Sequence, residues 1–260
     1  MDNVNKTLYI PLYGKACVSS KGLLLEDKKA EEIWEAEGFP LKGKAKSKWL
    51  AYYMGMRSAV FDRWAKKQMQ ENPGAVILHL GCGMDSRCLR VGTENCLWYD
   101  VDFPEVISER KRYFEETESY RMIASDVRET SWLDRIPAGK TAILVMEGIS
   151  MYLQQSELRE VLKRLKGHFG EVRILMDTYT VFAARATRYK NPINEVGVTV
   201  VYGLDDPGEL EAGTGITFLQ EHALTPEELI RQLPGAEQRF FRRMFAGKLA
   251  KKIYRLYEFH

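Results

Sequence analysis

The sequence predicts a three-layer α/β fold: a doubly wound, mostly parallel sheet of seven strands that ends in an antiparallel hairpin. Three observations lead to this prediction. From residue 75 onward, short apolar runs alternate with amphipathic helical patterns, as in parallel strands joined by crossover helices. A glycine turn follows the first of these runs, where a strand would give way to a helix. Two strand-like runs close the chain and bring the five earlier strands to seven.

Size and composition favour a single domain over residues 1–260. With 45% hydrophobic and 28% charged residues, the chain can bury a sizeable core without disulfides or a structural metal. A formal net charge of +2 gives no reason to expect nucleic acid as a partner. The sequence has no run of about 18 uncharged apolar residues and no signal-peptide pattern at its start, so no membrane contact is expected.

The four cysteines form no CxxC pair and have no histidine at metal-ligand spacing. The sequence therefore predicts no metal site and no disulfide framework. A reducing cytoplasm is the expected location. The oligomeric state does not follow from these features.

Residues 1–74 are expected to form an N-terminal helical region. A charged helix is predicted from Lys28 to Phe39, and a longer helix from Ser47 to Gln70. Apolar residues recur every three or four positions in the longer helix, which indicates a buried stripe. Arg57 lies within that stripe, so its guanidinium must find an anionic partner.

Five parallel strands and a crossover helix are predicted for the middle of the chain. The helix runs from Ser156 to Phe169, with its leucines on one face and its basic residues on the other. The strands are continuous apolar runs, as expected when both faces of a sheet are covered. They are Ala75–Leu80, Cys96–Val101, Arg121–Ala124, Ala142–Met146 and Val172–Met176.

The last third of the chain is predicted to contain an insertion, a helix and the hairpin. Residues 181–224 fit no sheet element, and their glycine, proline and aspartate content indicates an inserted lid. A helix is predicted from a capping Thr225 to Leu233. The hairpin strands are Arg239–Phe245 and Leu249–Phe259. We interpret the basic residues of this part as the solvated face of the strand pair.

Gly81-Cys82-Gly83 directly follows the first strand. Glycine lacks the Cβ that would keep a nucleotide-like ligand away from the backbone, although a purely structural turn would have the same sequence. Asp100 lies at the end of the second strand. Asp102 lies two residues further on, directly after Val101. Either carboxylate can accept hydrogen bonds from both ribose hydroxyls of an adenosine, or cap the next helix. Spacing does not decide between them, because residues two apart share a strand face.

Two further strand ends carry polar residues that suit an adenosine-containing ligand. Ser125-Asp126-Val127 follows the third strand, where an aspartate can accept a hydrogen bond from an adenine amino group or cap a turn. Glu147-Gly148 follows the fourth strand, where a carboxylate suits the amino group of a methionine moiety. Arg57 suits the corresponding carboxylate, or pairs with an internal acid such as Asp62.

The pairing of a GMDSR turn with the segment YDVDFP is far more specific than the glycines alone. The segments that carry it are Thr7–Ala16, Arg57 with Phe61-Asp62, Leu80–Arg87, Tyr99–Pro104, Ser125–Val127 and Glu147–Leu153. Over almost its whole length, the chain resembles the leucine carboxyl methyltransferase family, with its bacterial branch of tetracenomycin-pathway O-methyltransferases.

The resemblance implies a class I, Rossmann-like methyltransferase that binds S-adenosylmethionine. It favours Asp102 over Asp100 at the ribose, and we keep both. The substrate does not carry over, because residues 181–224 share no motif with the family's substrate cleft. The residues expected at the cofactor are Lys15, Arg57, Gly81, Cys82, Gly83, Asp100, Val101, Asp102, Ser125, Asp126, Val127, Glu147 and Gly148.

The expected function is methyl transfer from S-adenosylmethionine to a carboxylate or phenolic oxygen of a small molecule, for example a polyketide-like one. Such a transfer is an in-line displacement, so positioning and the exclusion of water carry most of the catalysis. A carboxylate is already ionised near neutral pH, whereas a phenol benefits from a base. Tyr152 is the candidate catalytic residue, and Asp177 is a second position just past a strand end; packing and capping are their alternative roles.

Two other functions remain open at this point. An NAD(P)-dependent oxidoreductase would share the first glycines and the acid after the second strand. However, Ser86 stands where GxGxxG has its third glycine, and the chain contains no Tyr-x-x-x-Lys. A non-catalytic S-adenosylmethionine-binding protein would keep the whole cofactor site.

Overall fold

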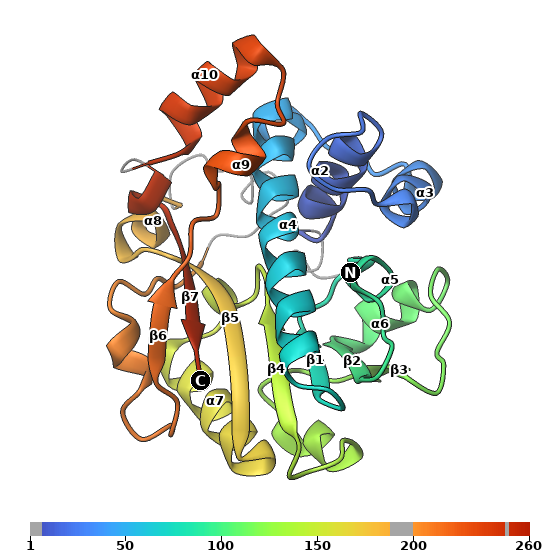
Figure 1. Cartoon of the computed structure of the whole chain (residues 1–260), viewed down its shortest axis with the longest axis vertical. Helices are drawn as coiled ribbons and strands as arrows, with labels where there is room; N and C mark the ends of the chain where they lie inside the picture. Colours follow the sequence, from blue (N-terminus) through green and yellow to red (C-terminus); the bar gives the residue numbers. More distant parts are fainter. Residues whose placement is uncertain (1–6, 188–199, 248–249) are drawn as a thin grey trace.

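A computed structural model describes residues 7–187, 200–247 and 250–260, and the chain folds around a seven-stranded sheet (Figure 1). The strand order is β3-β2-β1-β4-β5-β7-β6. Strands β1 to β5 run parallel, and β7 pairs antiparallel with both β5 and β6. The predicted fold class is thereby confirmed. The strands are β1 Val76–Leu80, β2 Leu97–Asp102, β3 Tyr120–Ala124, β4 Thr141–Met146, β5 Glu171–Tyr179, β6 Phe218–Glu221 and β7 Tyr254–Phe259.

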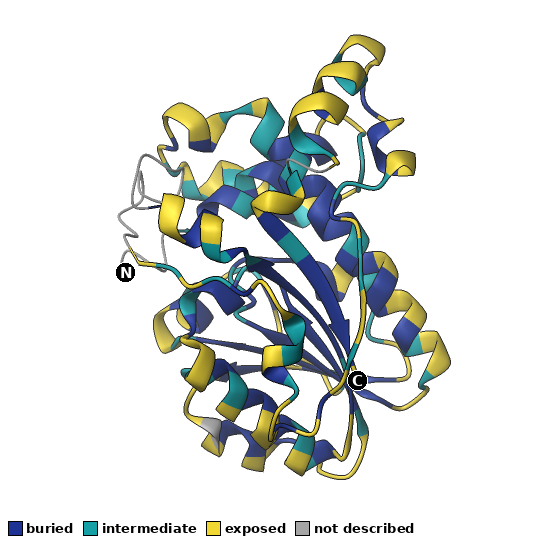
Figure 2. Cartoon of the chain, turned by 90° about the vertical axis from the view of Figure 1, so that its left-hand side faces the viewer, coloured by how far each residue is buried: buried dark blue, intermediate teal, exposed yellow. Residues whose placement is uncertain are grey.

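Successive side chains along the central strands point to opposite faces of the sheet and pack into two cores, one on each face. Along β1, Ile77 packs into the core that contains Phe61, while Leu78 packs into the core that contains Leu162. Every residue of β1 is buried, which explains its continuous apolar run. Figure 2 shows the buried sheet between helices whose outer sides are exposed.

The helices cover both faces of the sheet. They are α2 Tyr9–Ser19, α3 Lys28–Glu37, α4 Lys48–Glu71, α5 Arg87–Val91, α6 Pro104–Arg110, α7 Gln155–Phe169, α8 Val181–Ala186, α9 Glu227–Ile230 and α10 Gly235–Phe245. The predicted α3, α4 and α7 are confirmed within two residues at each end. The sequence does not predict α2, which packs so closely on α4 that a Cβ on Gly14 would lie 2.6 Å from Cβ of Met54. This contact brings Lys15 to the edge of the sheet.

The antiparallel strand pair is present, but its strands differ from the predicted hairpin. Arg239–Phe245 belongs to α10, because Phe241 and Phe245 lie one helical turn apart and stack with ring centroids 5.2 Å apart. The partner of β7 is instead β6, which falls inside the predicted insertion 181–224. Residues 188–199 of that insertion, and Lys248 and Leu249 of the hairpin, lie outside the described residues.

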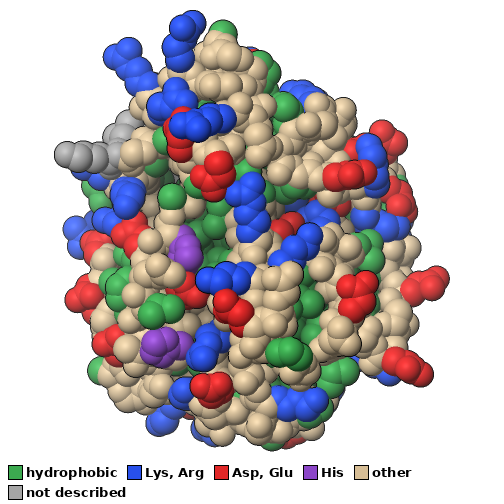
Figure 3. All heavy atoms as spheres, viewed as in Figure 1, with side chains coloured by type: hydrophobic (Ala, Val, Ile, Leu, Met, Phe, Trp, Pro, Cys, Tyr) green, Lys and Arg blue, Asp and Glu red, His purple; other side chains and the backbone are tan. Residues whose placement is uncertain are grey.

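The predicted helix after Thr225 is shorter than expected. It begins after Pro226, and the hydroxyl of Thr225 donates to the carbonyl of Phe245 at 3.3 Å instead of capping the helix. Of the basic residues of this part, Arg242 and Arg243 lie on α10, whereas Arg255 lies on β7 as a strand residue. Lys and Arg side chains gather at the upper end of Figure 3. Arg242 donates to Glu227 at 2.7 Å, so part of this charge joins α10 to α9.

Glu258 joins the antiparallel edge of the sheet to α4. Its carboxylate accepts hydrogen bonds from Nε1 of Trp64 and Nε2 of Gln220, both at 2.7 Å, and lies 2.6 Å from Nε2 of His222. Burial disfavours the ionised form, but these contacts outweigh burial and lower the pKa of Glu258 to about 2. The ionised carboxylate therefore stabilises the fold.

Glu258→Gln is expected to lower the free energy of unfolding at neutral pH by about 1–3 kcal/mol, because charged hydrogen bonds are lost. The folded-state pKa lies below the unfolded value of about 4, so this stabilisation is complete above that value and is lost as pH falls toward about 2. Urea denaturation of both proteins across this range measures it. The difference should shrink as pH falls, and a pH-independent difference would contradict the assignment.

Within residues 7–187, 200–247 and 250–260, no helix is long and apolar enough to cross a membrane. In the same ranges, no group of three or more His, Cys, Asp or Glu side chains could hold a metal ion. The four cysteines are free thiols. Burial raises the pKa of Cys88 to about 12, so this thiol stays protonated at neutral pH.

Candidate functional site

A cavity of about 340 Å³ opens at the carboxyl edge of the sheet. Open α/β sheets bind their ligands at this edge, and the volume is in the range of small-molecule sites. Residues that end or follow β1 to β5 line the cavity, together with residues of α2 and α4. The sheet order places these strand ends along the edge in the sequence β3, β2, β1, β4, β5.

Most residues predicted for the site line this cavity. Asp100 and Val101 do not. The predicted residues in the lining are Lys15, Arg57, Gly81, Cys82, Gly83, Asp102, Ser125, Asp126, Val127, Glu147, Gly148 and Tyr152. Segments far apart in the sequence therefore meet where the strand-end pattern predicts.

Asp100 is fully buried below the site. Its carboxylate accepts hydrogen bonds from Nε1 of Trp98 at 2.8 Å and from the hydroxyl of Tyr120 at 2.6 Å, and it pairs with Arg110. Asp100 and Asp102 share a face of β2, but only Asp102 stands at the strand end. The prediction that Asp100 and Val101 contact the cofactor is therefore wrong: both lie within the sheet and do not line the cavity.

The peptide at Gly83 is held from both sides. Its N–H donates to Oδ2 of Asp102 at 2.7 Å, and its carbonyl accepts from Nη1 of Arg110 at 3.0 Å. Gly81 and Gly83 have φ values of +66° and +52°, in the left-handed region that favours glycine. Burial raises the pKa of Asp102 to about 6, although the N–H groups of Gly83 and Phe103 partly offset this effect.

Asp126 lines the cavity at the end of β3 and also shapes its own turn. Its carboxylate accepts a hydrogen bond from the backbone N–H of Arg128 at 2.9 Å and pairs with the Arg128 guanidinium. Val127 next to it is buried, and its carbonyl accepts from Nε1 of Trp132 at 3.4 Å. Asp126 thus caps its turn and also lines the cavity, and its contact with adenine stays a prediction.

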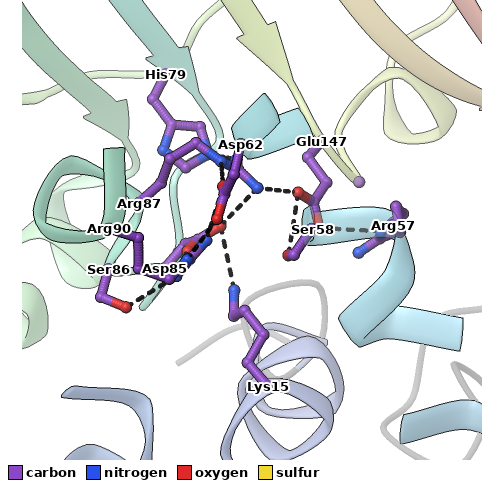
Figure 4. A network of polar contacts seen from close by, with 12 residues as sticks. Lys15, Arg57, Ser58, Asp62, His79, Asp85, Ser86, Arg87, Arg90 and Glu147 are labelled. Atoms are coloured by element: carbon purple, nitrogen blue, oxygen red, sulfur yellow. Dashed lines mark hydrogen bonds and ion pairs between the residues drawn. The ribbon is translucent and has the colours of Figure 1, made fainter. Parts of the chain in front are cut away.

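Glu147 joins Arg57 to Arg87 in a buried charge network (Figure 4). Its Oε1 accepts from Nε of Arg57 at 2.9 Å, and its Oε2 accepts from Nη2 of Arg87. Lys15 of α2 lies 3.1 Å from Asp85, which also pairs with Arg87. Burial disfavours an ionised Glu147, but Arg87 and Arg57 outweigh burial and lower its pKa to about 2. The network joins α2, α4 and the ends of β1 and β4.

The profile of the family described as Leucine carboxyl methyltransferase matches residues 6–166. The chain belongs to this family. The matched residues include the glycine turn, Asp102, Asp126 and Glu147, and they end within α7. Membership confirms the resemblance that the motifs indicate.

The sequences of two curated relatives match part of this chain. The tetracenomycin polyketide synthesis O-methyltransferase TcmP of Streptomyces glaucescens is 33% identical over 170 residues, which are 65% of this chain and 63% of that protein. The S-adenosyl-L-methionine-dependent methyltransferase dpfgK of Gibberella zeae is 30% identical over 183 residues, 65% of this chain and 61% of that protein. The chain thus matches about three fifths of the length of each relative.

Solved structures show the same fold at low identity. An S-adenosylmethionine-dependent methyltransferase from Mesorhizobium loti has a TM-score of 0.53 at 13% identity, covering 78% of this chain and 99% of that one. Magnesium protoporphyrin IX methyltransferase from Synechocystis, with bound S-adenosylhomocysteine, has a TM-score of 0.51 at 10% identity, covering 88% and 92%. This member of the leucine carboxyl methyltransferase family therefore has the class I methyltransferase fold.

In this family member, two buried acids share Arg57. Besides the bond to Glu147, its Nη1 donates to Oδ2 of Asp177 at 3.0 Å. Asp177 does not lie past a strand end as predicted but within β5, and its Oδ1 accepts from the N–H of Gly148 at 2.6 Å. Arg57 thus has internal acid partners and also lines the cavity. Asp177 is not itself a lining residue, but its hydrogen bonds fix the positions of Arg57 and Gly148, which are.

Sequence reasoning missed several residues that this fold brings to the site. Arg87 is part of the GMDSR motif, but two of its acid partners, Asp62 of α4 and Glu147 after β4, lie far away in the sequence and cannot be found by spacing. Tyr179 and Tyr254 line the cavity from β5 and β7. Because β7 runs antiparallel to β5, its first residue reaches the carboxyl edge. Only the strand order could have placed Tyr254 there.

Proposed function

We propose that the protein is an S-adenosylmethionine-dependent O-methyltransferase that acts on a small molecule. The observation that carries this proposal is the order of polar groups along the cavity. Asp126 lies at the end of β3, Asp102 at the end of β2, and the Arg57–Glu147 pair beside β4. Adenine, ribose and amino acid follow one another in the same order along S-adenosylmethionine.

The residues present fit this donor chemically. The carboxylate of Asp102 can accept hydrogen bonds from two ribose hydroxyls. Arg57 and Glu147 offer one cation and one anion to the zwitterionic amino acid end, and Lys15 adds a second cation to the same network. Asp126, with the backbone of Val127, can read the edge of the adenine ring.

The names of the relatives support methyl transfer to a small molecule. One is described as an O-methyltransferase of tetracenomycin polyketide synthesis, and the other as an S-adenosyl-L-methionine-dependent methyltransferase. Because the matches cover about three fifths of those proteins, the acceptor has to be argued from the residues of this chain.

Bound S-adenosylmethionine would supply a methyl group activated by its sulfonium. The chain's own part is to align an acceptor oxygen behind the methyl carbon and to keep water out. Arg57, Glu147 and Asp102 fix the donor from two sides. Tyr152, which is half-buried in the lining after β4, is the residue that we propose to contact the acceptor.

We also propose that the chain forms one domain in which the described part of the segment 181–224 borders the cavity. The N–H of Tyr202 in that segment donates to the carbonyl of Met151 at 2.8 Å, and Met151 lines the cavity. Lys15, Met54 and Arg57 of the N-terminal region also line the cavity.

Incubation with S-adenosylmethionine and a panel of phenols and carboxylic acids tests the proposed function. We expect release of S-adenosylhomocysteine that depends on the acceptor. If the protein binds S-adenosylhomocysteine tightly but forms none from S-adenosylmethionine with any acceptor of the panel, it would instead be a non-catalytic binding protein.

A further inference from the structure

A buried arginine contacts the glycine turn from outside the cavity. Arg110, the last residue of α6, is fully buried and is not a lining residue. Its Nη1 donates to the carbonyl of Gly83 at 3.0 Å. Because a buried guanidinium is costly unless its donors are paired, the partners of Arg110 indicate what this side chain does.

Asp100 and Tyr120 anchor this guanidinium to the sheet. Asp100 of β2 pairs with Nη2 of Arg110, and its carboxylate accepts from the hydroxyl of Tyr120 at 2.6 Å. The same hydroxyl, on β3, accepts from Nε of Arg110 at 3.1 Å. Nε and Nη2 thus hold the side chain on two neighbouring strands, while Nη1 contacts the turn. The single nitrogen of a lysine could not reach all three partners.

The contact with Arg110 bears on Asp102 through Gly83. The N–H of Gly83 donates to Oδ2 of Asp102 at 2.7 Å, on the other side of its Cα from the carbonyl that Arg110 holds. The two hydrogen bonds therefore fix the backbone of Gly83 on both sides of its Cα, where φ is +52°. Asp102 is the last residue of β2, and Arg110 is the last residue of the helix that follows it. One strand and its helix thus hold the turn at two points.

Arg110 also acts on the charge of Asp102. Burial raises the pKa of Asp102 to about 6, and Asp100 adds to this effect as a like charge. The N–H groups of Gly83 and Phe103 and the guanidinium of Arg110 lower the same pKa. Without Arg110, the carboxyl of Asp102 would keep its proton to higher pH and would be a poorer acceptor for ribose hydroxyls.

The other titratable groups around Asp100 and Arg110 are neutral near pH 7. Burial lowers the pKa of the histidine among them and raises the pKa of the tyrosine and of both thiols. These groups are His79 of β1, Tyr120 of β3, Cys82 of the glycine turn and Cys88 of α5. The charge beside Asp102 on this side is therefore set by the Asp100–Arg110 pair.

We propose that Arg110 is a positioning residue for S-adenosylmethionine, which fixes the turn at Gly83 and keeps the carboxylate of Asp102 in place for the ribose hydroxyls. This role rests on the ribose contact proposed for Asp102. Arg110 lies outside the lining, so it acts through these two residues and does not touch the donor. Asp100 holds Arg110 in turn, and so acts on the ribose site from within the sheet.

Arg110→Met tests this role through the pH dependence of donor binding. S-adenosylhomocysteine is titrated by calorimetry into the variant and the wild type at a series of pH values on both sides of neutrality. We expect at least about ten-fold weaker binding near neutral pH, because the turn loses a charged hydrogen bond. The pH at which affinity falls should rise from about 6 to about 7, because Asp102 loses a nearby cation. Arg112→Met is the matched control: Arg112 is exposed, pairs with Glu37 and Glu109, and should leave affinity and pH profile unchanged.

Two further variants separate the position of the side chain from its charge and from stability. Arg110→Lys keeps a cation but cannot reach all three partners, so its affinity should fall about 2- to 10-fold while the pH profile stays near that of the wild type. Glu258→Gln, which loses stability outside the cavity lining, should bind S-adenosylhomocysteine as the wild type does at neutral pH.

Wild-type affinity in either Arg110 variant overturns the proposal, and so does a loss of affinity in Arg110→Met without the shift in pH. An equal loss in Glu258→Gln also overturns it, because lower stability alone would then explain the result. If Arg110→Met does not fold, Arg110→Lys decides by the same affinity criterion. Wild-type affinity in Asp102→Asn would instead contradict the ribose contact, and failure of the wild type to bind S-adenosylhomocysteine would contradict the proposed function.

Discussion

Arg87→Met is expected to destabilise the fold by about 3–5 kcal/mol, because it removes a buried cation that three buried carboxylates share. Arg87 is fully buried and pairs with Asp62 at 2.7 Å, with Asp85 at 3.3 Å and with Glu147. Methionine has a similar length, so the change removes the charge and largely keeps the packing. Urea unfolding followed by the fluorescence of the five tryptophans measures the loss.

Arg164→Met is the matched control. Arg164 is exposed on α7, where it pairs with Glu160 one helical turn away. Exposed pairs of this kind contribute little, so we expect a change below about 0.5 kcal/mol. If the two arginine variants lost similar stability, the buried network would not hold the site together as its contacts indicate.

Asp102→Asn is expected to weaken S-adenosylhomocysteine binding by about 1–3 kcal/mol, roughly 5- to 150-fold, because a charged acceptor for the ribose hydroxyls is lost. The amide oxygen can still accept from Gly83, so the turn should keep its shape. Calorimetric titration of both proteins measures the change. Asp134→Asn, at an exposed aspartate outside the cavity lining, is expected to bind as the wild type does.

The same carboxylate predicts a pH dependence. Burial raises the pKa of Asp102 to about 6, so the ionised acceptor is lost as pH falls through that value, and affinity should fall with it. The effect on stability has the opposite sign. Between about 4 and 6 the folded state binds more protons than the unfolded chain, so the contribution of Asp102 to stability decreases as pH rises through this window. Affinity that stays constant from pH 7.5 to about 5 would contradict the role at the ribose.

The central sheet could be predicted from the sequence because strands covered on both faces are continuous apolar runs. The antiparallel edge could not. Strand β6 is half-exposed and short, and it lies far from β7 in the chain. Helix α10 contains enough phenylalanine to suggest a strand, and only its packing on Trp49 and Tyr52 of α4 shows that Phe240 and Phe241 belong to a helix. Such pairings depend on tertiary contacts, which propensity does not contain.

The cofactor side of the site was predictable for a similar reason. Residues that follow parallel strands meet at one edge of the sheet, so motif positions such as Asp126 and Glu147 could be brought together without a structure. The strand-end rule did not separate Asp100 from Asp102, because the two residues lie only two positions apart on the same strand face. Asp102 is the last residue of β2 and reaches the cavity, whereas Asp100 lies two residues inside the strand. The partners of Arg57 and the place of Tyr254 come from strands joined only by tertiary pairing, which spacing does not encode.

Calorimetric titration with S-adenosylhomocysteine and, separately, with NAD⁺ tests the central claim most directly. We expect S-adenosylhomocysteine to bind with a dissociation constant on the order of micromolar, and NAD⁺ to give no binding heat. The zwitterionic end of the first ligand matches the Arg57–Glu147 pair, whereas the second ligand would bring a pyrophosphate to a cavity edge occupied by buried acids. Binding of NAD⁺ without binding of S-adenosylhomocysteine would contradict the proposed methyl-donor site.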